Sequence, residues 1–192
     1  MENPWLRTPT PTLNAEPLPI PTERDRDVWQ PLPGISEPVS TLPVMEIDDE
    51  SSSVWFVGAH GGAGTSTMAR LCRGRDAGTS WPLGPRSTSV VVVARSDMRG
   101  LRAAQRVALQ WMSGTVQSVD LLGVVFVADS GGREPKQLKD FRRFVSGGFP
   151  HAWFVPWVET WRTIDSVEEA NVPRTVRKVT VQICEITERA RS

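Results

Sequence analysis

The stretch Val54-Trp55-Phe56-Val57-Gly58-Ala59-His60-Gly61-Gly62-Ala63-Gly64-Thr65-Ser66-Thr67 decides the fold of this chain. It passes from an apolar run through a glycine-rich loop into small hydroxyl residues, an order that predicts a strand, a loop and a helix. Glycines bring backbone N–H groups close to an anion, and the start of a helix favours negative charge. The stretch therefore predicts a phosphate site, with these candidate residues: Gly58, His60, Gly61, Gly62, Ala63, Gly64, Thr65, Ser66 and Thr67.

Apolar runs and amphipathic segments alternate along the rest of the chain. Strands are expected at residues 54–57, 89–94, 121–128 and 152–155, and continuous valine in the second indicates burial on both faces. Helices are expected at 65–73, from the cap at Ser96 or Asp97 to 112, from Pro135 to 147, and at 173–190, while 74–87 is expected to be a loop. This order predicts an α/β fold, an open and mainly parallel sheet with helices on both faces.

In such a sheet, ligands bind outside the carboxyl ends of the strands. Four segments should meet there: the glycine loop, 95–97, 129–131 and 156–159. Asp97 is a candidate water-mediated Mg²⁺ ligand, although capping of the next helix explains it more simply. Asp129 is a candidate contact to a base, although a structural role in a turn is the favoured reading. Three tryptophans near the last segment are expected to pack in the core and at its rim: Trp153, Trp157 and Trp161.

Residues 1–52 differ in composition from residues 53–192 and are expected to form a separate, disordered arm. Prolines recur throughout the arm, which forbids regular helix and favours extended, solvated chain. The alternative is a tether that carries short binding motifs, for instance at 29–33. Residues 53–192 then form the α/β domain.

Bulk composition excludes several classes of protein. The 192 residues carry a formal net charge of zero, so no overall attraction to nucleic acid or to an anionic membrane is expected. Two distant cysteines, Cys72 and Cys184, indicate reduced core residues of a cytoplasmic protein. We found neither an apolar run long enough to span a membrane nor a secretory signal at the N-terminus.

The segment from His60 to Thr67 resembles the deviant Walker A motif, Lys-Gly-Gly-Val-Gly-Lys-Thr-Thr, of the ParA/MinD family of P-loop ATPases. Residues 90–97, 122–127 and 155–156 are similar to later strands of that family. In the motifs Gly-Ala-His-Gly-Gly-Ala-Gly at 58–64 and Pro-Trp-Val-Glu at 156–159, the chain is also similar to a small uncharacterised P-loop family of high-GC Gram-positive bacteria, sometimes associated with mobile elements. These resemblances cover about residues 54–161 and imply a reduced P-loop domain that binds ATP or another nucleotide with Mg²⁺, with Ser66 as a metal ligand.

Several residues depart from the ParA/MinD pattern. Thr65 replaces the P-loop lysine, His60 replaces the signature lysine, and Val127 stands where the family has an adenine-contacting asparagine. No segment fits the Walker B strand, and the switch aspartate has no counterpart. Because one missing charge-stabilising donor can cost ~10²–10³ in rate, efficient hydrolysis is not expected and no catalytic residue is assigned. Candidates to replace the lost charge are Arg70, Arg95 and Arg99.

The sequence therefore favours a nucleotide- or phosphate-binding accessory or scaffold protein. The resemblance alone adds a role in plasmid or conjugative-element maintenance. The expected partners are a phosphate ligand and an unidentified protein, and a homodimer is left open. Two alternatives remain: a protein-interaction module without a ligand, and a slow ATPase that dimerises and borrows catalytic groups from its mate.

Overall fold

The computed structural model describes residues 41–48, 53–164, 167 and 172–190, all within one unit of the chain, 31–192. The parts of the expected arm at 1–40 and 49–52 lie outside the described residues. Within the described part, no helix is long and apolar enough to cross a bilayer. The elements in chain order are β1 (Val44–Glu46), β2 (Trp55–Gly58), α1 (Thr65–Leu71), β3 (Arg75–Asp76), β4 (Trp81–Leu83), β5 (Thr88–Arg95), α2 (Met98–Met112), β6 (Val119–Val127), α3 (Lys136–Ser146), β7 (Ala152–Val155), the 3-10 helix η2 (Glu159–Arg162) and α4 (Arg174–Ala190).

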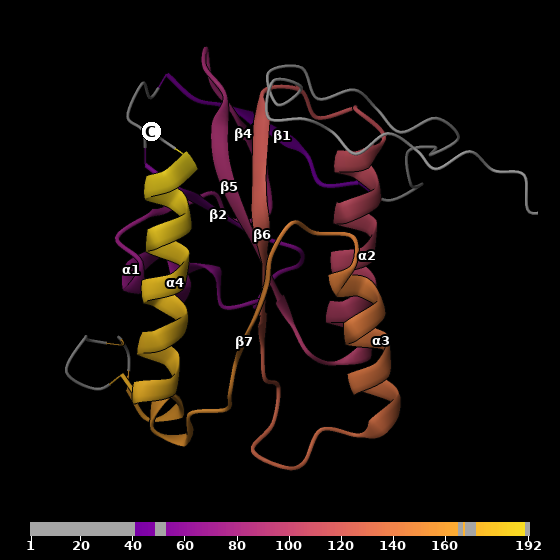
Figure 1. Cartoon of the computed structure of the whole chain (residues 1–192), viewed down its shortest axis with the longest axis vertical. Coiled ribbons are helices and arrows are strands. Elements are labelled where there is room, and N and C mark those ends of the chain that lie inside the picture. The colour runs from indigo at the N-terminus through magenta and orange to yellow at the C-terminus, as the bar shows by residue number, and fades with distance from the viewer. Residues whose placement is uncertain (1–40, 49–52, 165–166, 168–171, 191–192) are drawn as a thin grey trace, which may run out of the picture. The chain divides into compact units, whose positions relative to one another are not determined.

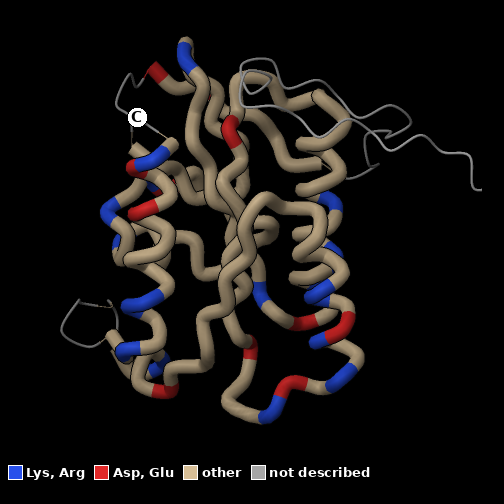
Figure 2. The backbone as a smooth tube through the Cα atoms, viewed as in Figure 1, with Lys and Arg blue, Asp and Glu red and all other residues tan. Residues whose placement is uncertain are grey.

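Five parallel strands form the main sheet, in the order β3-β2-β5-β6-β7. Figure 1 shows this sheet between two helical layers, with α1 and α4 on one side and α2 and α3 on the other. The central strands are largely free of charged residues, which lie on the helices and connections (Figure 2). The open parallel α/β fold predicted from the sequence is therefore confirmed.

The strands β5 and β6 form the centre of the core. Val90, Val91, Val92 and Val93 of β5 are fully buried, because odd and even positions face opposite helical layers. The glycine-loop strand β2 is buried as expected, although it runs from Trp55 to Gly58 rather than from residue 54 to 57. Continuous apolar sequence thus identified the strands that are covered on both sides.

The last helix, α4, packs on the sheet. Val176 and Ile183 are fully buried and share a core cluster with β5, β6 and β7. On the opposite side of the sheet, Val145 of α3 is buried, and Gly147 caps that helix. Arg142 of α3 pairs with Glu134 at 2.8 Å and lies over the ring of Phe154.

The prediction of a loop at residues 74–87 is wrong, because this segment contains β3 and β4. Strand β3 has only two residues, both exposed, at the edge of the main sheet, so no apolar pattern marks it. Strand β4 contains the buried Trp81 and pairs in parallel with β1, outside the main sheet. That pairing depends on a partner far away in the chain, which local composition does not reveal.

Strand β1 lies within the region that the sequence assigned to the arm. Residues 41–48 are anchored by the side chain of Gln110, which is only 3% exposed. Its Oε1 accepts from the backbone N–H of Leu42 and from the Trp81 indole, both at 2.9 Å, and its Nε2 donates to the Leu42 carbonyl. The amide of Gln110 therefore replaces a backbone partner and holds this segment against α2.

We expect Gln110→Ala to lower the free energy of unfolding by about 1–3 kcal/mol, because it leaves the buried Trp81 N–H unpaired. Urea denaturation measures this loss. The matched control is Gln105→Ala, on the same helix but partly exposed, which should change the free energy by no more than about 0.5 kcal/mol. Equal losses in the two variants would contradict the anchoring role.

Candidate functional site

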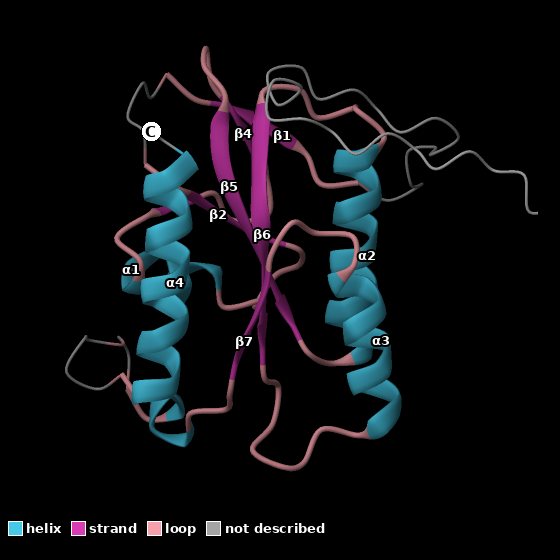
Figure 3. Cartoon of the chain, viewed as in Figure 1, coloured by secondary structure: helices cyan, strands magenta, loops and turns pink. Residues whose placement is uncertain are grey.

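The connections that follow β5, β6 and β7 leave the same end of the sheet, as Figure 3 shows. At this edge, the Nε of Arg95 donates to the Gly62 carbonyl at 3.1 Å, and Ser96 Oγ donates to Asp129 at 3.0 Å. Gly131 lies so close to Trp157 that an added Cβ would meet its ring at 2.9 Å. The four segments that the sequence placed at this edge therefore do meet.

The glycine loop turns where its sequence allows a left-handed backbone. Gly62 has φ of 77° and Gly64 has φ of 98°, values that favour glycine. Gly64 is also the N-cap of α1 and has no side chain with which to cap it. Among the described residues, the N–H groups of Gly64, Thr65 and Ser66 have no acceptor, as expected at the start of a helix.

His60 holds the loop to the end of β5. Its Nε2 accepts the backbone N–H of Arg95 at 3.2 Å, and its Nδ1 lies 2.9 Å from the Gly61 carbonyl. Both contacts are satisfied together by a neutral ring that carries its proton on Nδ1. Both nitrogens of this imidazole are thus occupied by backbone groups.

Thr65, at the position of the expected lysine, faces the interior. It is only 8% exposed, and its Oγ1 occupies the space that a side chain on Gly58 would need. The close approach explains the glycine at 58 and the small residue at 65. Neither residue offers a charge or an exposed polar group to a ligand.

A cavity of about 300 Å³ opens beside the loop. Only Gly64, Ser66 and Thr67 of the predicted phosphate-binding residues line it. The remaining candidates do not: Gly58, His60, Gly61, Gly62, Ala63 and Thr65. Its volume is at the lower end of the range for small-molecule sites, roughly 300–1,000 Å³.

The opposite wall of the cavity comes from the segment after β7, including Trp157 and Trp161. Trp161 Nε1 is the one buried side-chain donor or acceptor among the described residues that lacks a hydrogen-bond partner. A buried indole N–H normally has an acceptor, so this unpaired nitrogen is an unexplained polar group within the cavity wall. The sequence placed these tryptophans in packing roles, and no sequence signal marks the unpaired nitrogen.

The two candidate aspartates of this edge have structural partners and do not line the cavity. Asp97 caps α2, its Oδ1 accepting from the Gly100 N–H at 2.6 Å. Asp129 accepts from Ser96. Since Mg²⁺ sites use carboxylates with near-octahedral geometry, Ser66 and these aspartates do not fit a magnesium site in the cavity.

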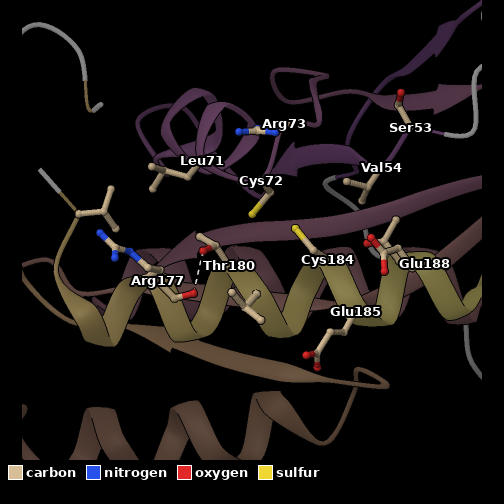
Figure 4. Close-up of a pocket in the computed structure, with 13 residues that line it drawn as sticks. Ser53, Val54, Leu71, Cys72, Arg73, Arg177, Thr180, Cys184, Glu185 and Glu188 are labelled. Carbon is tan, nitrogen blue, oxygen red and sulfur yellow. Dashed lines mark hydrogen bonds between the residues drawn. The ribbon is translucent and has the colours of Figure 1, made fainter. Parts of the chain in front are cut away.

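A larger cavity of about 930 Å³ lies between the C-terminal end of α1 and α4. Figure 4 shows the sulfur atoms of Cys72 and Cys184 facing each other there. Burial, with the neighbouring Cys184, raises the pKa of Cys72 to about 12, and burial also raises the pKa of Cys184. The thiolate is therefore rare at neutral pH, and none of the predicted site residues lines this cavity.

Residues 52–181 match the profile of a family of unknown function (DUF6668), a match that covers about two thirds of the chain. The chain belongs to the DUF6668 family. The match begins just before β2 and ends within α4, so it contains the glycine loop and the whole smaller cavity. Neither the curated proteins nor the solved structures include a match.

We expect Asp97→Ala to destabilise the fold by about 1 kcal/mol through loss of the helix cap, while Asp97→Asn stays close to the wild type. Urea denaturation of both variants, with and without Mg²⁺, measures the difference in their free energies of unfolding. Mg²⁺ alone should leave the wild-type stability unchanged. A stabilisation by Mg²⁺ that Asp97→Asn abolishes would instead make Asp97 a metal ligand.

Proposed function

We propose that this chain binds a nucleotide or another phosphate-bearing ligand in the smaller cavity and acts as an accessory or scaffold protein. The observation that carries the proposal is the composition of that cavity. Ser66 and Thr67 provide hydroxyl groups beside the start of α1, while Arg70 and Arg95 provide positive charge. Such a set suits an anionic group, and the apolar opposite wall suits the organic part of a ligand.

Binding without efficient turnover is the activity that these residues support. Phosphoryl transfer depends on positioned charge, bound Mg²⁺ and an oriented nucleophile. Thr65 is buried, Asp97 caps a helix and Asp129 is bonded to Ser96. We therefore propose a ligand-holding role of ParA/MinD-like type, in the cytoplasm, where the two free thiols stay reduced. The link to plasmid or conjugative-element maintenance rests on the resemblance of the loop.

A protein-interaction role has one observation in its favour. Phe144 on α3 is 68% exposed and stacks on Phe141, with ring centroids 6.2 Å apart. An exposed aromatic side chain is a common anchor for another protein, and Phe144 is supported here by the partly buried Phe141. This role is compatible with a scaffold that binds its ligand elsewhere. A slow, dimerisation-dependent ATPase would differ from both by releasing phosphate, and Ser66→Ala should then abolish the release.

The test is thermal unfolding with ATP, ADP or GTP at millimolar concentration. A ligand at ten times its Kd should stabilise the folded state by about 1.4 kcal/mol, which corresponds to a rise in Tm of roughly 3–6 °C for a chain of this size. Ser66→Glu should abolish the rise, because it places a negative charge in the cavity without disturbing the first turn of α1.

The matched control is Thr175→Glu, which adds the same charge at the second residue of α4, outside the cavity. This variant should respond to the nucleotides like the wild type. The proposal is wrong if no nucleotide and no inorganic phosphate or pyrophosphate shifts the wild-type Tm. It is also wrong if both glutamate variants respond equally.

A further inference from the structure

The charged residues that line the smaller cavity all have the same sign. They are Arg70 of α1, Arg95 at the end of β5 and Arg162 of η2, and no aspartate or glutamate lines the cavity among the described residues. Arg162 is 65% exposed and forms an ion pair with Glu159 at 3.3 Å. The uncompensated positive charge therefore belongs to Arg70 and Arg95.

Arg95 is the better positioned of these two. Its Nε donates to the Gly62 carbonyl at 3.1 Å, and one terminal nitrogen donates to the Ala128 carbonyl at 3.0 Å. These two bonds fix a planar guanidinium between the glycine loop and the end of β6. A guanidinium has five N–H donors, so three remain beside the cavity. Arg70, by contrast, is exposed on α1.

The position of Arg95 is set by the backbone on both sides. Its own N–H donates to His60, and the first turn of α2 packs so closely that a Cβ on Gly100 would collide with the Arg95 carbonyl. The side chain therefore leaves the sheet at a fixed point next to the loop. Its charge therefore lies beside the glycine loop. The loop supplies no charge of its own there, because the buried Thr65 occupies the position of the expected lysine.

A divalent cation has no equivalent support in this cavity. Ser66 and Thr67 supply the only side-chain oxygens among the lining residues described. The carboxylates of the same edge are used elsewhere: Asp97 binds the Gly100 N–H, Asp129 binds Ser96, and Glu159 binds Trp157 and Arg162. Mg²⁺ usually needs one or two carboxylates besides the phosphate oxygens, and this cavity offers none.

We infer that Arg95, rather than a loop lysine and Mg²⁺, neutralises the bound phosphate, so that this is a metal-independent anion site. The inference rests on the proposed function, because it concerns the same cavity. Planar N–H pairs of a guanidinium match the oxygens of a phosphate, which a single ammonium group matches less specifically. Arg95 is thus a binding residue that also holds the loop.

The test is calorimetric titration of the full chain with ADP and with inorganic pyrophosphate, in EDTA and in millimolar Mg²⁺. The wild type should bind at least as tightly in EDTA as in Mg²⁺. Arg95→Gln should weaken binding by about 10-fold or more, as expected for loss of charge-assisted hydrogen bonds. Arg102→Gln removes an equal charge from the exposed side of α2, outside the cavity, and should leave the affinity unchanged.

Because Arg95 also binds the Gly62 carbonyl, its loss could act through the loop alone. The salt dependence of pyrophosphate affinity separates the two roles. Loss of a charge that contacts the anion reduces the slope of affinity against ionic strength, whereas a purely structural change leaves it as steep as in the wild type. Arg95→Lys should recover part of the affinity and the wild-type slope.

The outcomes separate the inference from the function on which it rests. Binding that requires Mg²⁺, or that survives Arg95→Gln, overturns the inference and leaves the proposed function standing. An unchanged salt slope in Arg95→Gln also overturns it. If neither ADP nor pyrophosphate binds the wild type in either buffer, while another nucleotide does in the thermal test, the metal-independent phosphate site is refuted and a nucleotide-specific site remains.

Discussion

The structure depends on burying β5 on both of its faces. Residues Val90 to Val93 are fully buried, and the strand pairs in parallel with β2 and β6, so its backbone groups are satisfied within the sheet. A strand covered on both faces requires a helical layer on each side, and parallel neighbours require crossover connections. The position of the site follows, because parallel strands end at one edge and their following loops must meet there.

Sequence periodicity predicted the elements that bury apolar surface locally and missed those that depend on distant partners. The strands β2, β5, β6 and β7 are short apolar runs, and α2 and α4 carry clear apolar stripes. Strand β3 has two exposed residues, and β4 is ordered by β1 and by the amide of Gln110. That three-way contact joins residues 42, 81 and 110, and no local pattern encodes it.

The sequence predicted where in the fold the candidate site lies, but it did not predict which side chains line the cavity. Parallel topology brought the loop to the ends of β5, β6 and β7, as the sequence implied. Which loop side chains face the cavity depends on the turn of α1, which buries Thr65 and exposes Ser66. Likewise, the placement of the Arg95 side chain beside the cavity depends on Gly62 and Ala128, which are distant in sequence. The order of residue types along the sequence does not reveal these side-chain orientations.

The positive charge of the proposed site is carried by Arg95 at the end of β5 and not by a residue of the glycine loop. This position affects which chemistry the site can support. Only interactions that strengthen in a transition state accelerate a reaction. Arg95 already donates two N–H groups to backbone carbonyls, and the carboxylates at this edge are engaged in structural hydrogen bonds. Cleavage would also need a group that activates water, and none of the described residues that line the cavity carries a carboxylate or an imidazole. The proposed site is therefore better equipped to hold a ligand than to cleave it, in agreement with the accessory or scaffold role proposed above.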